Sequence, residues 1–307
     1  MPSIATLHLP PRVVQLNQKR LQRCFFFLAE KPVIPSSYFN KDTMKTLFCY
    51  HSQSGSTATA CRSLSKKMDF VSWHLWDVAT GIPPEIETYD LIGFATWTYY
   101  LGLPPFFEQF LSVLPDQNGK PAFLFSTFGV MPGQVLVKMK KILTAKGYTV
   151  LDGYSLHTPE SYPPYIVKGW HNLDAPASRE VAEFESFAAR LAGHLQSIHT
   201  GKASKPAKIK LDLFSRLIPP YSLQKIRLEM GSLAVDAALC DQCGICSQAC
   251  LYGAIDSRVP PVFDPEKCMG CWACFNHCPQ QAIFTSKVRG QGQYSQPAGA
   301  LSARLDK

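Results

Sequence analysis

The chain has 307 residues, of which 46% are hydrophobic and 18% charged, a balance that excludes wholesale disorder and allows one large domain or two smaller ones. No apolar run approaches the roughly 18 residues of a membrane span, and the apolar stretch at 24–29 is shorter than a signal-peptide core of about 7–15 residues, so we expect a cytoplasmic protein. The formal net charge of +8 suggests a nucleic-acid partner, but residues 1–43 carry six Lys or Arg against two acids and supply half of it.

Residues 1–43 show no sustained hydrophobic period, whereas a buried-strand pattern begins at Thr46, directly after Met44 and Lys45. Two explanations fit this boundary. Either translation begins at Met44 and the start at Met1 is mis-assigned, or residues 1–29, which include basic side chains and no acids, are a transit peptide. We therefore treat residues 1–43 as an unstructured N-terminal extension or a mis-assigned start.

Short apolar runs alternate with helical patterns over residues 44–198. Strands are predicted at Thr46–Tyr50, Phe70–Leu75, Leu91–Thr96, Ala122–Ser126 and Tyr148–Leu151. Helices are predicted at Thr57–Lys67, Pro104–Leu114, Gly133–Ala145 and Ala175–Ser197. Strands that alternate with helices usually form a parallel sheet covered on both faces. The predicted fold class is therefore α/β, with a doubly wound five-stranded parallel sheet.

Three further segments follow this domain. Residues 199–232 begin with a polar, basic run and continue into an apolar stretch interrupted by Pro219 and Pro220, so we predict a linker and a helical bridge. Residues 233–286 hold a cysteine-rich module. Residues 287–307 are rich in Gly, Gln and Ser and are predicted to be a disordered tail.

Eight of the eleven cysteines lie in two segments that align at an offset of 28 residues. The first segment contains Cys240, Cys243, Cys246 and Cys250, and the second contains Cys268, Cys271, Cys274 and Cys278. Each has the C-x₂-C-x₂-C-x₃-C spacing of bacterial two-cluster ferredoxins, in which the fourth cysteine ligates the other cluster. We therefore predict two 4Fe–4S clusters, with Cys278 completing the first segment's cluster and Cys250 completing the second's.

Two alternatives to iron–sulfur clusters are weaker. Without an export signal, clustered thiols more often bind metal than form disulfides. Zinc sites use two separated cysteine pairs, which a third close cysteine fits poorly. Two clusters of about −2 each would also cancel the remaining positive charge, so we expect redox partner proteins and no nucleic acid. One departure from the ferredoxin pattern is Leu251, which stands where the second segment has Pro279.

A polar turn separates the first predicted strand from the first predicted helix. It contains Ser52, Gln53, Ser54, Gly55, Ser56 and Thr57. Backbone N–H groups, a helix N-terminus and several hydroxyls suit an anion there. The turn lacks both the lysine of a Walker P-loop and the G-x-G-x-x-G fingerprint. It would suit a phosphate monoester such as that of FMN, although a simple capped turn is the alternative.

Residues 48–57 resemble the phosphate loop of the flavodoxin family, with Cys61 as a departure in the helix that follows. Two further strand ends are similar to flavodoxin loops that contact the flavin ring, one by stacking and one through backbone amides. These loops contain Thr96, Trp97, Thr98, Tyr99 and Tyr100, and Ser126, Thr127, Phe128 and Gly129, respectively. The resemblance implies FMN at the carboxyl ends of the sheet.

Over roughly residues 44–286 the chain resembles the flavodoxin–ferredoxin fusion proteins of anaerobic prokaryotes, in which a small α+β ferredoxin domain follows the flavodoxin-like domain. This resemblance implies a protein that relays electrons between two 4Fe–4S clusters and FMN and on to a redox partner. The alternative is an FMN-dependent oxidoreductase of a small molecule, fed by its own clusters. His51, Tyr154 and His157 are candidate acids or bases for it. We assign no catalytic residue, because the sequence offers neither a nucleophile nor an NAD(P)H fingerprint.

Overall fold

The computed structural model describes residues 43–202, 204, 206, 208, 209, 215, 217–256, 258, 260–294 and 298–306. The predictions made for residues 1–43 lie outside the described residues, Thr43 apart. No helix in these ranges combines the length and the hydrophobicity that a bilayer crossing requires.

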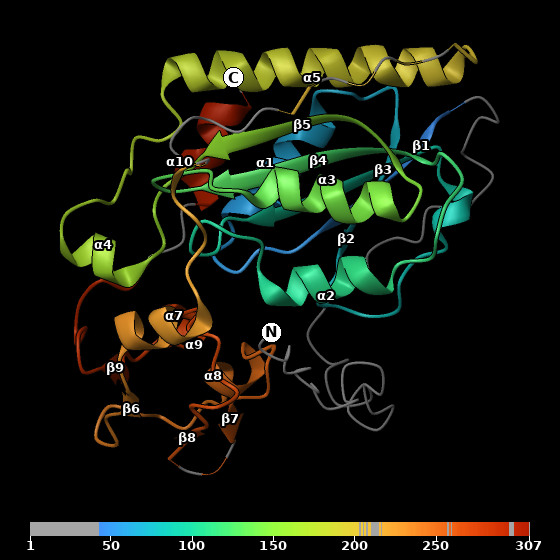
Figure 1. The fold of residues 1–307 in the computed structure, drawn as a ribbon. Helices are drawn as coiled ribbons and strands as arrows, with labels where there is room; N and C mark the ends of the chain where they lie inside the picture. Colours follow the sequence, from blue (N-terminus) through green and yellow to red (C-terminus); the bar gives the residue numbers. More distant parts are fainter. Residues whose placement is uncertain are drawn as a thin grey trace. The chain divides into compact units, whose positions relative to one another are not determined.

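A five-stranded parallel sheet forms the centre of the first domain (Figure 1). Its strands are β1 (Lys45–Tyr50), β2 (Ser72–Asp77), β3 (Leu91–Trp97), β4 (Pro121–Phe128) and β5 (Thr149–His157). The strand order is β2-β1-β3-β4-β5, and every pairing is parallel. This is the flavodoxin-like doubly wound order, so the expected fold class is confirmed.

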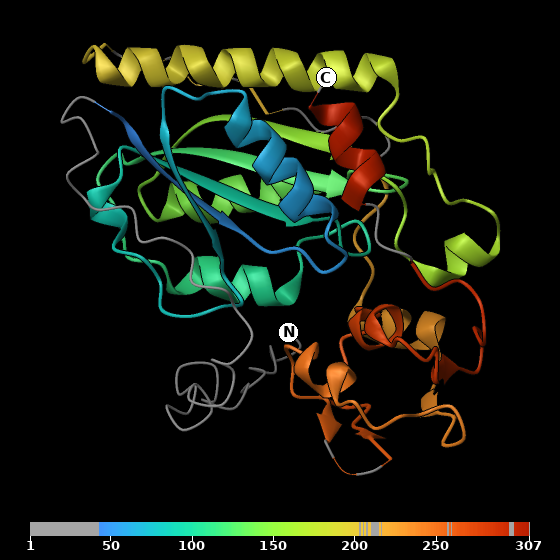
Figure 2. The same cartoon turned by 180° about the vertical axis from the view of Figure 1, so that it is seen from behind.

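Helices cover both faces of this sheet. The covering helices are α1 (Ser56–Lys66), α2 (Pro105–Val113), α3 (Val135–Ala145) and α5 (Ser178–His199). A short helix α4 (Pro163–Val167) lies in the connection between β5 and α5, and a 3-10 turn η3 (Ile86–Thr88) precedes β3. Successive strand residues point to opposite faces. Phe48 therefore packs under α1 and α5, while its neighbours Leu47 and Cys49 pack under α2 and α3. Figures 1 and 2 show these two helix pairs on opposite sides of the sheet.

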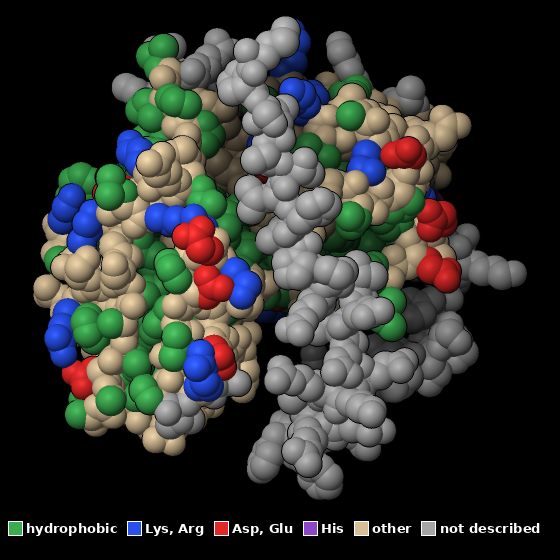
Figure 3. Space-filling model, turned by 60° about the horizontal axis from the view of Figure 1, so that its bottom comes forward, with side chains coloured by type: hydrophobic (Ala, Val, Ile, Leu, Met, Phe, Trp, Pro, Cys, Tyr) green, Lys and Arg blue, Asp and Glu red, His purple; other side chains and the backbone are tan. Residues whose placement is uncertain are grey.

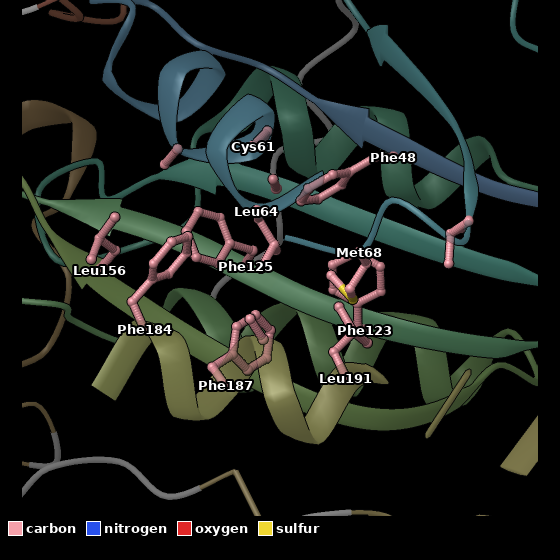
Figure 4. Packing of buried hydrophobic residues seen from close by; sticks show 14 of the residues in the cluster. Phe48, Cys61, Leu64, Met68, Phe123, Phe125, Leu156, Phe184, Phe187 and Leu191 are labelled. Carbon is pink, nitrogen blue, oxygen red and sulfur yellow. The ribbon is translucent and has the colours of Figure 1, made fainter. Parts of the chain in front are cut away.

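Phenylalanine rings fill the layer between the sheet and α5 (Figure 4). Phe48, Phe123 and Phe125 come from the sheet and are fully buried. The ring of Phe125 stacks on Phe187 of α5 at a centroid distance of 6.1 Å. Gly93 in β3 leaves room for these rings, because a Cβ there would lie 2.3 Å from the ring of Phe123. The first domain thus has a dense core that holds the strand ends in place.

Strand β5 differs most from its predicted range, Tyr148–Leu151. It continues to His157, where it pairs with Phe128 of β4. The polar residues from Asp152 onward interrupt the apolar pattern and concealed this half of the strand. The Asp152 carboxylate is nevertheless buried, because it accepts a hydrogen bond from Arg190 Nε of α5 at 2.8 Å. Tertiary pairing therefore extends the strand beyond its local signal.

The C-terminal module consists of short helices and strands around the two cysteine segments. Its elements are α7 (Leu223–Met230), β6 (Leu233–Val235), α8 (Ile245–Gln248), β7 (Ile255–Asp256), β8 (Val262–Phe263), α9 (Ala273–His277) and β9 (Ile283–Thr285). Antiparallel pairs join β6 to β9 and β7 to β8. A small core includes Met230, Trp272, Phe275 and Val288. This arrangement is the α+β module that the resemblance implies.

The disordered tail predicted for residues 287–307 is wrong for the described part of that segment, which contains helix α10 (Ala298–Leu305). Leu301 and Leu305 are fully buried in the core cluster shared with α1 and α5. Figures 1 and 2 both place α10 beside α1. Two leucines four residues apart lie on one helix face, but so few apolar residues in a Gly- and Ser-rich segment give no sequence signal.

Surface charges of both signs lie near each other. Lys and Arg side chains are interspersed with Asp and Glu on the described part of the face in Figure 3. Ion pairs on the first domain include Lys138 with Glu108 at 2.8 Å. Such exposed pairs contribute about 0–1 kcal/mol each.

The packing of α10 predicts that Leu301→Ala lowers the free energy of unfolding by about 2–5 kcal/mol, the usual cost of truncating a buried leucine. Chemical denaturation of the purified protein measures this change. Ala303→Ser, on the exposed side of the same helix, is the matched control and should change stability by about 0.5 kcal/mol or less. Equal stability of the Leu301 variant and the unchanged protein would mean that the tail does not pack.

Candidate functional site

A cavity of about 370 Å³ lies at the carboxyl ends of the sheet strands. Loops that follow β1, β3, β4 and β5 contribute to its wall, together with the second cysteine segment. The wall includes Gln53, Trp97, Thr98, Tyr99, Tyr100, Leu101, Gly129, Val130, Met131, Glu160, Ser161, Tyr162, Cys271 and Trp272. Ligands of doubly wound sheets bind at this edge. We call this space the strand-end cavity.

The polar turn between β1 and α1 has the geometry of an anion-binding loop. Gly55 has a positive φ of 88° and precedes the first residue of α1, a backbone that glycine adopts without strain. Ser56 and Thr57 are buried, and Thr57 Oγ1 lies 2.8 Å from Thr127 Oγ1. Ser52 Oγ is buried and has no hydrogen-bond partner within the described protein. Because buried polar atoms are normally satisfied, this hydroxyl fits a bound phosphate.

The aromatic loop after β3 lies between the strand-end cavity and the cysteine module. Trp97 Nε1 is buried without a partner among the described residues, and the indole packs edge-on to Tyr99 at 5.6 Å. Thr98 Oγ1 donates to the carbonyl of Pro132 at 3.0 Å. Thr96, at the end of β3, is fully buried. Of the predicted aromatic residues, Trp97 therefore has the polar atom that a ligand in the cavity could satisfy.

The loop after β4 is held by contacts to β5. Ser126 Oγ lies 2.7 Å from Ser155 Oγ, and the Phe128 ring stacks on His157 at 5.2 Å. The carbonyl of Gly129 accepts a hydrogen bond from His157 Nε2 at 2.7 Å. Among the site residues predicted at the end of β4, Gly129 lines the wall of the strand-end cavity, whereas Ser126, Thr127 and Phe128 do not.

The three candidate acid–base residues make structural contacts to other protein groups. His51 Nδ1 lies 3.3 Å from Asp77 Oδ1, and His157 Nδ1 lies 2.9 Å from Glu180 Oε1. Tyr154 donates to the carbonyl of Glu180 at 3.1 Å. None of the three lines the cavity among the described residues.

Glu160 is a cavity residue that the sequence did not indicate. Its Oε1 accepts hydrogen bonds from the backbone N–H groups of Ser161 and Tyr162 at 2.7 and 2.8 Å. Burial raises the pKa of this carboxyl, although both N–H groups oppose that change. The loop that carries it follows the half of β5 that the apolar pattern concealed, which is why sequence reasoning missed it.

The eight cysteines of the module gather in two sets. One small cavity is lined by Cys240, Cys243, Cys246 and Cys278. A second is lined by Cys250, Cys268, Cys271 and Cys274. These are the same two sets that crossed ligation requires, because in each set the fourth thiol comes from the other segment. Four thiols around each of two cavities fit two iron–sulfur clusters.

The turn after the fourth cysteine is alike in both segments. The N–H of Ala254 donates to Cys250 Sγ and the N–H of Ala282 donates to Cys278 Sγ, each at 3.3 Å. Leu251, in the place of the usual proline, therefore leaves this amide–sulfur contact intact. Hydrogen bonds to ligand sulfurs tune the potential of a cluster.

The other two cysteines that the structure describes lie outside both sets. Cys49 and Cys61 are buried in the hydrophobic layers on opposite faces of the sheet. Burial raises the pKa of both thiols, so we expect them to stay protonated and unreactive.

Three successive backbone carbonyls of the second cysteine segment accept hydrogen bonds from the first domain. Tyr99 donates to the carbonyl of Met269, Tyr100 donates to that of Gly270 at 3.0 Å, and Gln53 Nε2 donates to that of Cys271. Burial raises the pKa of both tyrosines, which keeps their phenols as donors at neutral pH. We call this set of three hydrogen bonds the carbonyl clamp.

Trp272 adds to the contact between the second cysteine segment and the first domain. It has a positive φ of 64° where the first segment has Gly244 at 74°, an uncommon conformation for a bulky residue. Its Nε1 donates to the Tyr100 hydroxyl at 3.0 Å, and its ring packs edge-on to Tyr162 at 5.9 Å. The backbone strain is therefore accompanied by contacts to two loops of the first domain.

Two family models match the chain, a flavodoxin domain at residues 47–156 and a 4Fe-4S binding domain at residues 261–284. The second match covers the segment with Cys268–Cys278, and the first cysteine segment lies outside it. A search of curated proteins finds no match.

Solved flavoprotein structures are among those similar to the chain. A flavodoxin from the domain Archaea has 16% identity over 50% of this chain and 99% of its own, with a TM-score of 0.38. A Fusobacterium nucleatum flavodoxin bound to flavin mononucleotide has 18% identity over 35% of this chain and 68% of its own, with a TM-score of 0.30. Rubredoxin oxygen:oxidoreductase from the anaerobe Desulfovibrio gigas has 16% identity over 51% of this chain and 38% of its own, with a TM-score of 0.35.

The fold and the family matches define the class of protein. The chain carries a flavodoxin domain followed by a 4Fe–4S ferredoxin domain. This order fits a flavodoxin–ferredoxin fusion, and both domains support a role in electron transfer that involves flavin and iron–sulfur.

The grouping of the thiols predicts which cluster each cysteine serves. Cys278→Ala should damage the cluster of Cys240, Cys243 and Cys246, although Cys278 lies closer in sequence to the other three. Electron paramagnetic resonance of the reduced protein should lose one of two cluster signals, and Cys250→Ala should lose the other. Loss of the same signal from both variants would contradict the crossed assignment.

Proposed function

We propose that the chain is a cytoplasmic electron-transfer protein that relays electrons between two 4Fe–4S clusters and FMN and on to a redox partner protein. One observation carries this proposal most directly. Cys271 and Trp272 line both the strand-end cavity and the cavity of the second cysteine set. A thiol that would ligate one cluster therefore also borders the space that would hold the flavin ring.

The residues of the first domain fit FMN. The loop with Ser52, Gly55 and Ser56 offers buried hydroxyls and a helix N-terminus to the phosphate, and the strand-end cavity offers Trp97 and Tyr162 to the ring. When bound, flavin can exchange one or two electrons, and each cluster can exchange one. The protein's contribution is to fix the loops so that the flavin and the cluster of the second cysteine set would lie on opposite sides of Cys271.

The two cysteine sets differ in exposure. Cys243, in the set completed by Cys278, is exposed, whereas Cys274 in the other set is buried. The cavity of the first set is lined by residues of the module alone among those described. The set completed by Cys278 is thus the side from which a redox partner could approach, and the set completed by Cys250 adjoins the first domain.

A second candidate function is an FMN-dependent oxidoreductase of a small molecule. Glu160 favours it, because this half-buried carboxyl lies on the cavity wall and burial raises its pKa, as is common for catalytic acids and bases. The contacts of Glu160 to two backbone N–H groups also allow a purely structural role. Glu160→Gln separates the two functions, because it should abolish turnover of a substrate while leaving electron transfer between the cofactors unchanged.

Cofactor content tests the proposed function. Anaerobically purified protein should contain about eight iron atoms and about one FMN per chain, since two 4Fe–4S clusters require eight irons. Iron analysis and the absorption spectrum before and after reduction measure this directly. About four iron atoms would remove one cluster from the proposal. Stoichiometric zinc, or failure of added FMN to bind, would contradict it.

A further inference from the structure

The C-terminal segment passes from the cysteine module to the first domain. Gln293 Nε2 donates to the carbonyls of Phe275 and Cys278 at 2.8 and 2.6 Å. The N–H of the next residue, Tyr294, donates to Asn276 Oδ1 at 3.1 Å. At its start the segment is therefore bound to α9, the helix within the second cysteine segment, and to Cys278.

The same segment ends on the flavin domain. Arg304 Nη1 donates to the carbonyls of Leu173 and Ala175 at 2.6 and 2.8 Å. Lys66 of α1 pairs with Asp306 at 2.6 Å. With its two leucines buried in the core, α10 anchors the end of the chain against the helix that begins at the phosphate loop (Figure 2).

Tyr294 lies between these two anchors and reaches the phosphate loop. Its side chain is 6% exposed, and its hydroxyl lies 3.2 Å from Ser56 Oγ. Ser56 is itself buried and is the first residue of α1. Burial is the largest cause that raises the pKa of Tyr294 to about 12, so the phenol is neutral and can donate at neutral pH.

We propose that Tyr294 is a positioning residue for the FMN phosphate, so that the C-terminal segment completes the flavin site from the far end of the chain. The inference rests on the proposed FMN binding and adds a residue to that site. A short serine at the helix start has several rotamers, and a hydrogen bond to a buried phenol selects one of them. Ser56 then presents its hydroxyl and N–H to the phosphate already ordered.

The position of Tyr294 also links phosphate binding to docking of the cysteine module. The backbone of Tyr294 is held by Asn276 of the cysteine module, whose Nδ2 donates to the carbonyl of Ser161 at 3.0 Å. A module that moved away from the first domain would withdraw Tyr294 from Ser56. Phosphate binding and docking of the module are therefore coupled, and each stabilises the other by the same factor.

Comparison of FMN with riboflavin, which lacks the phosphate, tests the inference. Tyr294→Phe removes one hydrogen bond and should weaken FMN binding by about 2- to 10-fold. Riboflavin binding should not change, because Ser56 has no phosphate to contact. Fluorescence titration of the full-length protein measures both affinities. Tyr148→Phe, at a buried tyrosine just before β5 and thus at the opposite edge of the sheet, is the matched control.

A mutant cycle asks whether Tyr294 acts through Ser56. In the Ser56→Ala background, Tyr294→Phe should cause no further loss of FMN affinity. Independent losses in the cycle would overturn the inference, as would equal losses for FMN and riboflavin, or no loss for either. Failure of the unchanged protein to bind FMN is a different result, which would overturn the proposed function and the inference with it.

Discussion

The carbonyl clamp is the interaction on which the proposed relay depends. Three side chains from two strand-end loops donate to the carbonyls of Met269, Gly270 and Cys271. Each neutral hydrogen bond contributes about 0.5–1.5 kcal/mol net, but leaving one buried partner unsatisfied costs about 1–3 kcal/mol. The contact between the strand-end loops and the second cysteine segment is therefore stabilised less by the net energy of each hydrogen bond. It is stabilised more by the free-energy cost of leaving buried groups unsatisfied when the two parts separate.

Contacts of the segments that precede and follow the module also limit how it can turn about the clamp. The N–H of Tyr221, just before α7, donates to the carbonyl of Tyr100 at 3.2 Å. On the other side, the C-terminal segment is fixed to α1 and to Ser56. The module enters and leaves the first domain through bonded segments, so the second cysteine set has one preferred position beside the strand-end cavity. Electron transfer between cofactors needs such a fixed separation, which a flexible tether alone would not provide.

Local patterns predicted what depends on local chemistry. The continuous apolar run of β1, the alternation of strands with helices and the regular spacing of the cysteines indicated the sheet and the two thiol sets, because these patterns can be recognised without knowledge of the contacts between distant residues. The second half of β5, helix α10 and Glu160 could not be predicted in this way. Asp152 is polar yet buried by Arg190, and the two leucines of α10 become apolar anchors only on a surface made by α1. The clamp is equally hidden, because its acceptors are backbone carbonyls, which every sequence has.

The proposed relay requires that the flavin site and the cluster sites work as one fixed unit. Rapid photochemical reduction of the clusters, followed by the flavin absorption, tests it most directly. For a fixed unit, the flavin reduction rate constant should stay the same over a tenfold dilution of the protein, since the electron moves within one molecule. A rate constant that rises in proportion to protein concentration would show transfer between separate molecules and would contradict the fixed unit.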